Sequence, residues 1–229
     1  MKKFLSFIFF IFLLANSFAQ KLNKVTISNN GKNVIISILL DQNVVLNISQ
    51  DGAIADWGVD KYVDRRADYY ERSLEKFEGR VENYKENDNE AYKGKIKFIG
   101  GVQIKYFDSF EDEMLVGKIK SIGAVSFDYY NKYEEETSKG KIKSVGSTNF
   151  TYFSPFENEA YRGKIKNAGN AAFSYYSSMD DKAYAGKIKT MNGGLFTYYS
   201  SQDKNFPIGA MKVGRQIQYI NGISYIVRN

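Results

Sequence analysis

The sequence predicts an all-β fold built from repeated antiparallel hairpins. The tetrapeptide Gly-Lys-Ile-Lys starts at five positions, and each start lies 23 residues after the one before. Within each period, apolar and polar residues alternate with the period of two that is typical of strands, and aromatic residues are frequent. A fixed period of this length indicates a repeat architecture. The starts are Gly94, Gly117, Gly140, Gly163 and Gly186, and a degenerate sixth lies at Gly209.

Positions in the repeat are counted here from this first glycine as offset zero. Apolar residues occupy offsets two, five and ten, and tyrosine occupies offset twelve in all five copies. Offset six is glycine in four copies and Asn192 in the fifth, which suits a tight turn that needs positive φ. Each unit is therefore expected to hold two strands, near offsets one to five and eight to thirteen, followed by an acidic loop.

Two arrangements of these strands fit the pattern, a meander of hairpins and a solenoid with one unit per coil. Lysine occupies offsets one and three in every copy. A parallel solenoid would stack each lysine row about 4.8 Å apart, well within a Debye length of about 8 Å. A meander places a second strand between the lysines and roughly doubles the gap, so the sequence favours the meander.

The start of each unit resembles the opening of a MORN repeat. The shared pattern is Tyr-x-Gly-x-hydrophobic, as in Tyr92-Gly94-Ile96, Tyr161-Gly163-Ile165 and Tyr184-Gly186-Ile188. The chain lacks the tryptophan that follows the first glycine in MORN repeats, and it lacks their later Gly-x-Gly. The resemblance covers about half of the chain, implies β-hairpins and brings no functional residue with it. The chain also resembles uncharacterised secreted repeat proteins of Bacteroidota.

The first 19 residues have the three parts of a secretory signal peptide. Lys2-Lys3 precedes an apolar run from Phe4 to Ala15, and small residues end at Ala19. The apolar run is short for a membrane span. We therefore expect export after cleavage near Ala19, to the periplasm, the outer surface or the medium, and no transmembrane span in the mature chain.

The rest of the chain divides into four parts. Residues 20–60 contain short apolar runs separated by turn residues and are expected to form a small antiparallel sheet. Residues 61–93 are expected to be a degenerate capping unit. Within it, residues 61–78 fit either an amphipathic helix or a strand that resembles the second strand of a repeat. Residues 94–208 hold the five repeats. Residues 209–229 contain Asn221-Gly222 between two apolar runs and are expected to close the array as a hairpin.

Composition excludes several kinds of chemistry. The chain has no histidine and no cysteine, which excludes imidazole bases, catalytic triads, thiol chemistry and disulfides. No phosphate-binding glycine motif occurs. Carboxylates remain, and the acids that stand apart from the repeat are Asp56, Asp60 and Asp64, beside the single tryptophan, Trp57. We expect Trp57 to close the core, and we expect no enzyme activity, no cofactor and no metal.

A lysine and aromatic face is the best candidate binding surface in the sequence. If alternation continues to offset thirteen, aromatic rings there share a sheet face with the lysines of offsets one and three. Such a face could hold an anionic polysaccharide, whereas export argues against nucleic acid. The candidate residues are Lys95, Lys97, Lys118, Lys120, Lys141, Lys143, Lys164, Lys166, Lys187, Lys189, Phe107, Tyr130, Phe153, Tyr176 and Tyr199.

These observations predict a non-catalytic, exported repeat protein that acts as an interaction or structural scaffold. The expected partner is an envelope protein or a glycan. A binding module for anionic polysaccharide is the second hypothesis, and a carboxylate-dependent glycoside hydrolase is the third.

Overall fold

The protein is all-β, as the sequence predicts. A computed structural model describes residues 20–60 and 74–229, and within these ranges the regular elements are strands and one short 3-10 turn, η2 (Asp41–Asn43). The strands of the two ends are β1 (Lys21–Ser28), β2 (Val34–Leu39), β3 (Val44–Ser49), β4 (Ile54–Val59), β5 (Val81–Asn83), β17 (Met211–Val213), β18 (Ile217–Ile220) and β19 (Ile223–Arg228). The strands of the repeats are β6 (Ile96–Ile99), β7 (Val102–Tyr106), β8 (Ile119–Ile122), β9 (Val125–Tyr129), β10 (Ile142–Val145), β11 (Thr148–Tyr152), β12 (Ile165–Ala168), β13 (Ala171–Tyr175), β14 (Ile188–Met191), β15 (Gly194–Leu195) and β16 (Thr197–Tyr198).

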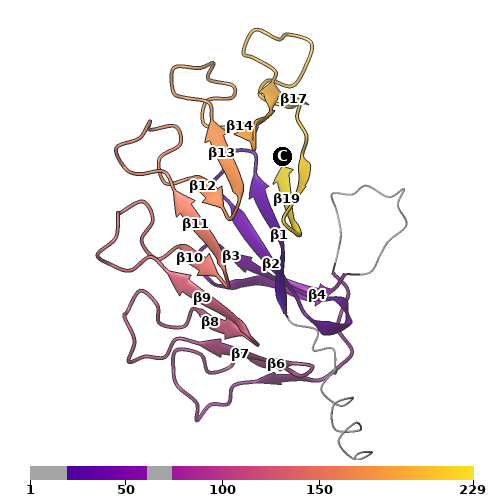
Figure 1. Cartoon of the computed structure of the whole chain (residues 1–229), viewed down its shortest axis with the longest axis vertical. Coiled ribbons are helices and arrows are strands. Elements are labelled where there is room, and N and C mark those ends of the chain that lie inside the picture. Colours follow the sequence, from indigo (N-terminus) through magenta and orange to yellow (C-terminus); the bar gives the residue numbers. More distant parts are fainter. Residues whose placement is uncertain (1–19, 61–73) are drawn as a thin grey trace, which may run out of the picture.

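The repeats form one long antiparallel meander. Strands β5 to β15 make an 11-stranded sheet in which every strand pairs with its neighbours in the chain. Each unit supplies a tight hairpin, and a long loop leads to the next unit. The loops therefore project side by side from the same ends of successive hairpins (Figure 1). The meander prediction is confirmed, and the parallel solenoid is excluded.

The tight turns follow from the residue at offset six. Gly100, Gly123, Gly146 and Gly169 have φ between 54° and 57°, and Asn192 has φ 46°. This left-handed conformation is favourable for glycine and is tolerated by asparagine better than by most other residues. The turn prediction is therefore confirmed in all five units.

A β-bulge at offset three changes the alternation that the sequence suggests. Lys105 pairs with Ser121, but Tyr106 pairs with Ile119, so Lys120 is an extra residue in its strand. The same register shift occurs between the other units. Because of the bulge, offsets two and five both point into the core although they are three residues apart; Ile119 and Ile122 are both fully buried.

The N-terminal strands form a mixed sheet rather than a purely antiparallel one. Its order is β18-β19-β1-β2-β3-β4, and β19 pairs with β1 in parallel from Lys24–Ser224 to Ser28–Arg228. The last strand of the chain therefore lies beside the first, as Figure 1 shows. The C-terminal hairpin is present as predicted, with positive φ at Asn221 and Gly222, but it extends the N-terminal sheet instead of capping the array.

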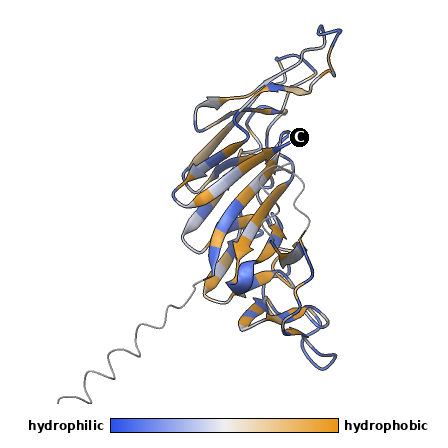
Figure 2. Ribbon diagram, turned by 90° about the vertical axis from the view of Figure 1, so that its right-hand side faces the viewer, coloured by the Kyte–Doolittle hydropathy of each residue, from blue (hydrophilic) through white to orange (hydrophobic). Residues whose placement is uncertain are grey.

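The two large sheets share a single hydrophobic core. Buried aliphatic residues of β1 to β3 and the buried positions of the repeats belong to one cluster, and apolar residues run along the facing strands in Figure 2. Turns of the N-terminal sheet also bond to the repeats: the N–H groups of Ile119, Ile142 and Ile188 donate to carbonyls of Gly52, Gln50 and Asn29 at 3.3, 2.8 and 2.7 Å.

Two predictions fall on residues outside the described ranges. The first is the signal peptide, residues 1–19. The second is most of the segment for which helix and strand were both open, residues 61–73, and this range includes the candidate acid Asp64. The described chain resumes at Leu74, and Glu75 forms an isolated antiparallel bridge with Val59. Within the described ranges, no helix is long and apolar enough to cross a membrane.

Candidate functional site: surfaces of the repeat array

The lysines at offset one form links between consecutive units. Each ammonium donates a hydrogen bond to the carbonyl oxygen of the first glycine in the next unit, for example Lys141 to Gly163 at 2.6 Å. The same ammonium lies over the offset-twelve ring of its own unit, 4.8 Å from the centroid of Tyr152 for Lys141. Burial lowers the pKa of these lysines, and the pKa of Lys164 falls to about 8. The five are Lys95, Lys118, Lys141, Lys164 and Lys187.

The first glycine is needed for this link. Gly163 has φ 72°, and the equivalent glycines have φ between 70° and 76°. At Gly186, an added Cβ would come within 2.6 Å of the Ala160 carbonyl oxygen and 2.8 Å of the Lys164 ammonium. The fold therefore explains each residue of the tetrapeptide Gly-Lys-Ile-Lys. The glycine adopts positive φ, the first lysine links two units, the isoleucine packs in the core, and the second lysine lies in the bulge.

The tyrosines at offset twelve complete the inner layer. Each is buried and donates its hydroxyl hydrogen to the offset-two carbonyl of its own unit, as Tyr152 does to Ile142 at 3.1 Å. Burial raises the pKa of all five hydroxyls well above the ordinary value, so the rings stay neutral. The five are Tyr106, Tyr129, Tyr152, Tyr175 and Tyr198.

The lysines at offset three lie in the bulges and face the loops. The ammonium of Lys143 lies 3.0 Å from a Glu134 carboxylate oxygen and 5.4 Å from the centroid of the Tyr130 ring. In the neighbouring units, Lys120 pairs with Glu111 at 2.8 Å and Lys166 with Glu157 at 3.8 Å. Lys97 and Lys189 lie over the rings of Tyr84 and Tyr176.

The rings at offset thirteen lie beneath the lysines of offset three, so the structure brings the two predicted parts of the face together. The ammonium groups of Lys120, Lys143 and Lys166 lie 5.1 to 5.4 Å from the centroids of the Phe107, Tyr130 and Phe153 rings. The rings are not an open platform, because Phe107, Tyr130, Phe153 and Tyr176 are half-buried and also pack against the core. Each meets the offset-twelve tyrosine of the next unit edge to face, with centroids 5.8 to 6.1 Å apart. Tyr199 stacks on Phe206 at 4.3 Å.

The structure thus brings the lysines and rings of the predicted ligand face together, but the ammonium groups lie against the ring faces instead of pointing to solvent beside them. The lysines cover the rings, and carboxylates neutralise three lysines of offset three. A flat, open platform of rings is not formed by these residues. Whether the lysines also bind a glycan stays a prediction.

All six loops of the array contain the same turn. The N–H of offset seventeen donates to the carbonyl of offset fourteen in each one, from Asp88 to Lys85 in the first loop to Asp203 to Ser200 in the last. The four intervening pairs are Glu111 to Asp108, Glu134 to Asn131, Glu157 to Ser154 and Asp180 to Ser177, with distances from 3.2 to 3.3 Å. Offset sixteen is the third residue of this turn, and we refer to this position as the loop tip.

Four consecutive loop tips carry large apolar side chains that are almost fully exposed. Phe110, Tyr133, Phe156 and Met179 are 91, 86, 94 and 95 % exposed. The first and last loops have Asn87 and Gln202 at the same position. We call these four residues the tip row. The sequence contained this signal, but the acidic character of the loops concealed it.

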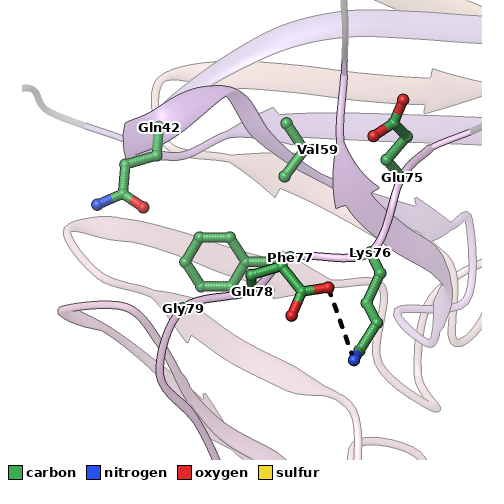
Figure 3. A pocket seen from close by; sticks show the side chains of 7 residues that line it. All are labelled: Gln42, Val59, Glu75, Lys76, Phe77, Glu78 and Gly79. Carbon is green, nitrogen blue, oxygen red and sulfur yellow. Dashed lines mark ion pairs between the residues drawn. The ribbon is translucent and has the colours of Figure 1, made fainter.

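The residues around Trp57 form no concentrated site in the described parts of the chain. Trp57 is half-buried against the core, as expected, while Asp56 is exposed. A pocket of about 630 Å³ lies near the end of β4 and is lined by Gln42, Val59 and residues 75–79 (Figure 3). Its carboxylates are the exposed Glu75 and Glu78, and Glu78 lies 3.7 Å from the Lys76 ammonium. The described residues contain no group of three or more acidic side chains that could hold a metal ion.

Comparison with known proteins gives no relative for this chain. No family model, no curated protein and no solved structure matches it.

Proposed function

We propose that this protein is a non-catalytic, exported scaffold that docks another macromolecule through the tip row. The observation that supports the proposal is the placement of four large apolar side chains at the same exposed position of four consecutive loops. Single exposed apolar residues are normal on protein surfaces. A row of four at a fixed period is a different feature, because it offers a regular set of apolar contacts to one partner.

The loop does not need the apolar residue for its own structure. The first and last loops have Asn87 and Gln202 at offset sixteen, and they contain the same turn with the same hydrogen bond. The apolar side chains make the loops less soluble without contributing to the core. Binding is the role that accounts for keeping them in water.

The chemistry of the partner follows from spacing and charge. Two strands per unit separate consecutive tips by roughly 10 Å along the sheet. Acidic residues follow each tip, with Glu111, Asp112 and Glu113 after Phe110 as one example. A fitting partner is therefore a protein surface with apolar pockets at this spacing and basic residues around them.

Replacing the tip row with the residues of the outer loops tests the proposal. The test variant carries Phe110→Asn, Tyr133→Asn, Phe156→Asn and Met179→Gln. We expect it to fold with unchanged stability, because the replaced side chains make no core contact. Cross-linking of the mature chain in an envelope extract, followed by quantitative mass spectrometry, should show a defined protein that is captured by the wild type and lost by the variant.

A matched control separates tip contacts from general stickiness. Leu195, Val213 and Tyr219 are also exposed, by 53, 61 and 70 %, but they lie on strands outside the tip row. Their triple replacement by asparagine should leave capture intact. Capture of the same proteins by the wild type and the tip-row variant would contradict the proposal.

A further inference from the structure

A basic groove lies where the N-terminal sheet meets the bases of three loops. Its volume is about 670 Å³, which is far more than one small ion needs. Six basic side chains and one carboxylate line it, and its other described lining residues are neutral. The basic residues are Lys32, Lys141, Arg162, Lys164, Lys182 and Lys187, and the carboxylate belongs to Glu159.

Two turns of the N-terminal sheet, which contribute Lys32 and Gln50, meet the repeats in this groove. Lys32 is carried by the turn between β1 and β2, and that turn is fixed to the array. The carbonyl oxygen of Asn29 accepts a hydrogen bond from Ile188 N–H at 2.7 Å. Gly31 lies so close to Tyr175 that an added Cβ would be 2.3 Å from a ring carbon. The charge of Lys32 is therefore held next to the lysines of the repeats by packing.

The repeat changes its sequence at this groove. Offset nineteen is glutamate in four units, at Glu90, Glu113, Glu136 and Glu159. It is Lys182 in the unit that starts at Gly163, where it lines the groove, and Asn205 in the next unit. Two of these glutamates pair with a lysine three residues later, Glu90 with Lys93 and Glu136 with Lys139. The loop structure does not require lysine here, and the change of sign makes the groove more positive.

The concentrated charge has a cost that an anion would relieve. Burial, with a further contribution from the charge of Lys32, lowers the pKa of Lys164 to about 8. Its hydrogen bond to the Gly186 carbonyl, at 2.5 Å, uses one of the three donor hydrogens of the ammonium. The remaining donors of such clustered cations are suited to oxygen atoms that carry negative charge.

We propose that this groove binds a multivalent oxyanion, in which several phosphate, sulfate or carboxylate groups are carried on one molecule. None of the described residues that line the groove is aromatic, so charge and hydrogen bonding would provide the recognition. This site is separate from the tip row and goes beyond the docking function. Of the lysines that the sequence singled out, it uses Lys141, Lys164 and Lys187, and it adds Lys32, Arg162 and Lys182.

Titration calorimetry on the mature chain tests the site with two probes, inorganic tripolyphosphate and a galacturonate hexamer. At low salt we expect one or both to bind, and binding should weaken as salt rises. The double variant Arg162→Glu plus Lys182→Glu should weaken it by at least about tenfold, since it reverses two charges in the groove. The fold should be retained, because both side chains are exposed and Lys182→Glu restores the residue of four other units.

A second double variant, Lys189→Glu plus Lys212→Glu, makes the same charge change away from the groove and should alter the affinity by less than about twofold. Glu159→Gln should strengthen binding, because it removes the one carboxylate of the groove. The stronger probe identifies phosphate or carboxylate as the preferred group. Failure of both probes to bind at low salt, or an equal loss in the two double variants, would overturn the proposal. Neither result depends on the tip row, whose variant leaves the groove unchanged.

Discussion

Two rows of aromatic and apolar side chains run along the array with the same period but in opposite environments. The tyrosines of offset twelve are buried, and each hydroxyl bonds to a carbonyl of its own unit. The tip row of offset sixteen lies in water. Both rows appear in the sequence as regular features, so a fixed period alone does not separate a structural role from a functional one.

The last unit separates the two roles. Tyrosine is present at offset twelve in all five complete units, whereas offset sixteen changes to Gln202 in the last of them; the degenerate first unit has Asn83 and Asn87 at the two positions. A residue that the fold requires persists wherever the fold persists. A residue that varies while the local structure stays the same is constrained by function rather than by the fold. The following predictions test this distinction, from the largest expected effect to the smallest.

Alkaline pH should unfold the protein through the buried tyrosine row. Burial raises the pKa of Tyr152 and its equivalents above the ordinary value of 10.0. The folded state then holds more protons than the unfolded state at higher pH, so the free energy of unfolding falls as the pH rises above about 10. The lysines act in the opposite direction, because the pKa of Lys164 is lowered to about 8 from 10.5. Stability should therefore rise slightly between pH 8 and 10 and then collapse.

Urea titrations across this pH range, together with tyrosinate absorbance, measure the effect. Tyr152→Phe should be less stable by about 1 kcal/mol at neutral pH, where it lacks a hydrogen bond, and its decline above pH 10 should be shallower. If the buried tyrosines ionise at a lower pH than the one at which the protein unfolds, the row does not hold the array together.

Truncation of three rings in one unit should give three different losses of stability. Phe150 is fully buried at offset ten, and its replacement by alanine should cost roughly 3–5 kcal/mol. Phe153 is half-buried beside Tyr161 and Tyr175, and its loss should cost about 1–3 kcal/mol. Phe156 belongs to the tip row, and its replacement by alanine should lower the free energy of unfolding by less than about 0.5 kcal/mol. Chemical denaturation of the three variants gives the order, and an equal cost at Phe153 and Phe156 would contradict it.

Gly52→Ala should break the contact between the two sheets. Gly52 has φ 86°, and a Cβ there would lie 2.3 Å from the Tyr129 hydroxyl oxygen. Backbone strain and the clash together should cost roughly 2–4 kcal/mol. Gly101 is a control, since its φ lies outside the left-handed region and an added Cβ would meet nothing within 4 Å. Thermal denaturation should show a large shift for the first variant and almost none for Gly101→Ala.

The two lysines of one tetrapeptide should differ on replacement by methionine. Lys141 is half-buried and links two units, so Lys141→Met should cost about 1–2 kcal/mol. Lys143 pairs with Glu134 near the surface, and pairs of this kind contribute about 0–1 kcal/mol. Denaturation at low and high salt distinguishes them, because only the Lys143 contribution should fade with salt. A larger loss at Lys143 would reverse our assignment of the two rows.

The local features of the repeat could be predicted from the sequence, and those that depend on distant strands could not. Alternation and turn glycines predicted the hairpins and the buried positions correctly, and the spacing of the lysine rows predicted the meander. The parallel pairing of β1 with β19 joins residues about 200 positions apart, as in Thr26 with Ile226. Short apolar strands pair equally well with many partners, so the sequence pattern contains no rule that selects this one.

The candidate surfaces show the same division. The offset-thirteen rings meet the offset-three lysines as the sequence predicts. The bulge at Lys120 and the strand end at Tyr106 were not predicted from the sequence, and neither was the packing of these rings against the core. The tip row and the change from glutamate to Lys182 were visible in the sequence as departures between units. What could not be seen was that Lys32, from the N-terminal sheet, lies beside Lys164.

The pairing of the first and last strands limits how this gene can evolve. Repeat arrays ordinarily gain or lose units by duplication and deletion, because each unit contacts only its neighbours. Here the N-terminal turns and the C-terminal hairpin bind particular units, Gly52 at Ile119 and Tyr225 at Ala168 among them. One inserted unit would move the attachment points of the hairpin by roughly 10 Å relative to β1. The attachments at both ends of the chain thus constrain the number of units, and with it the number and positions of the loop tips.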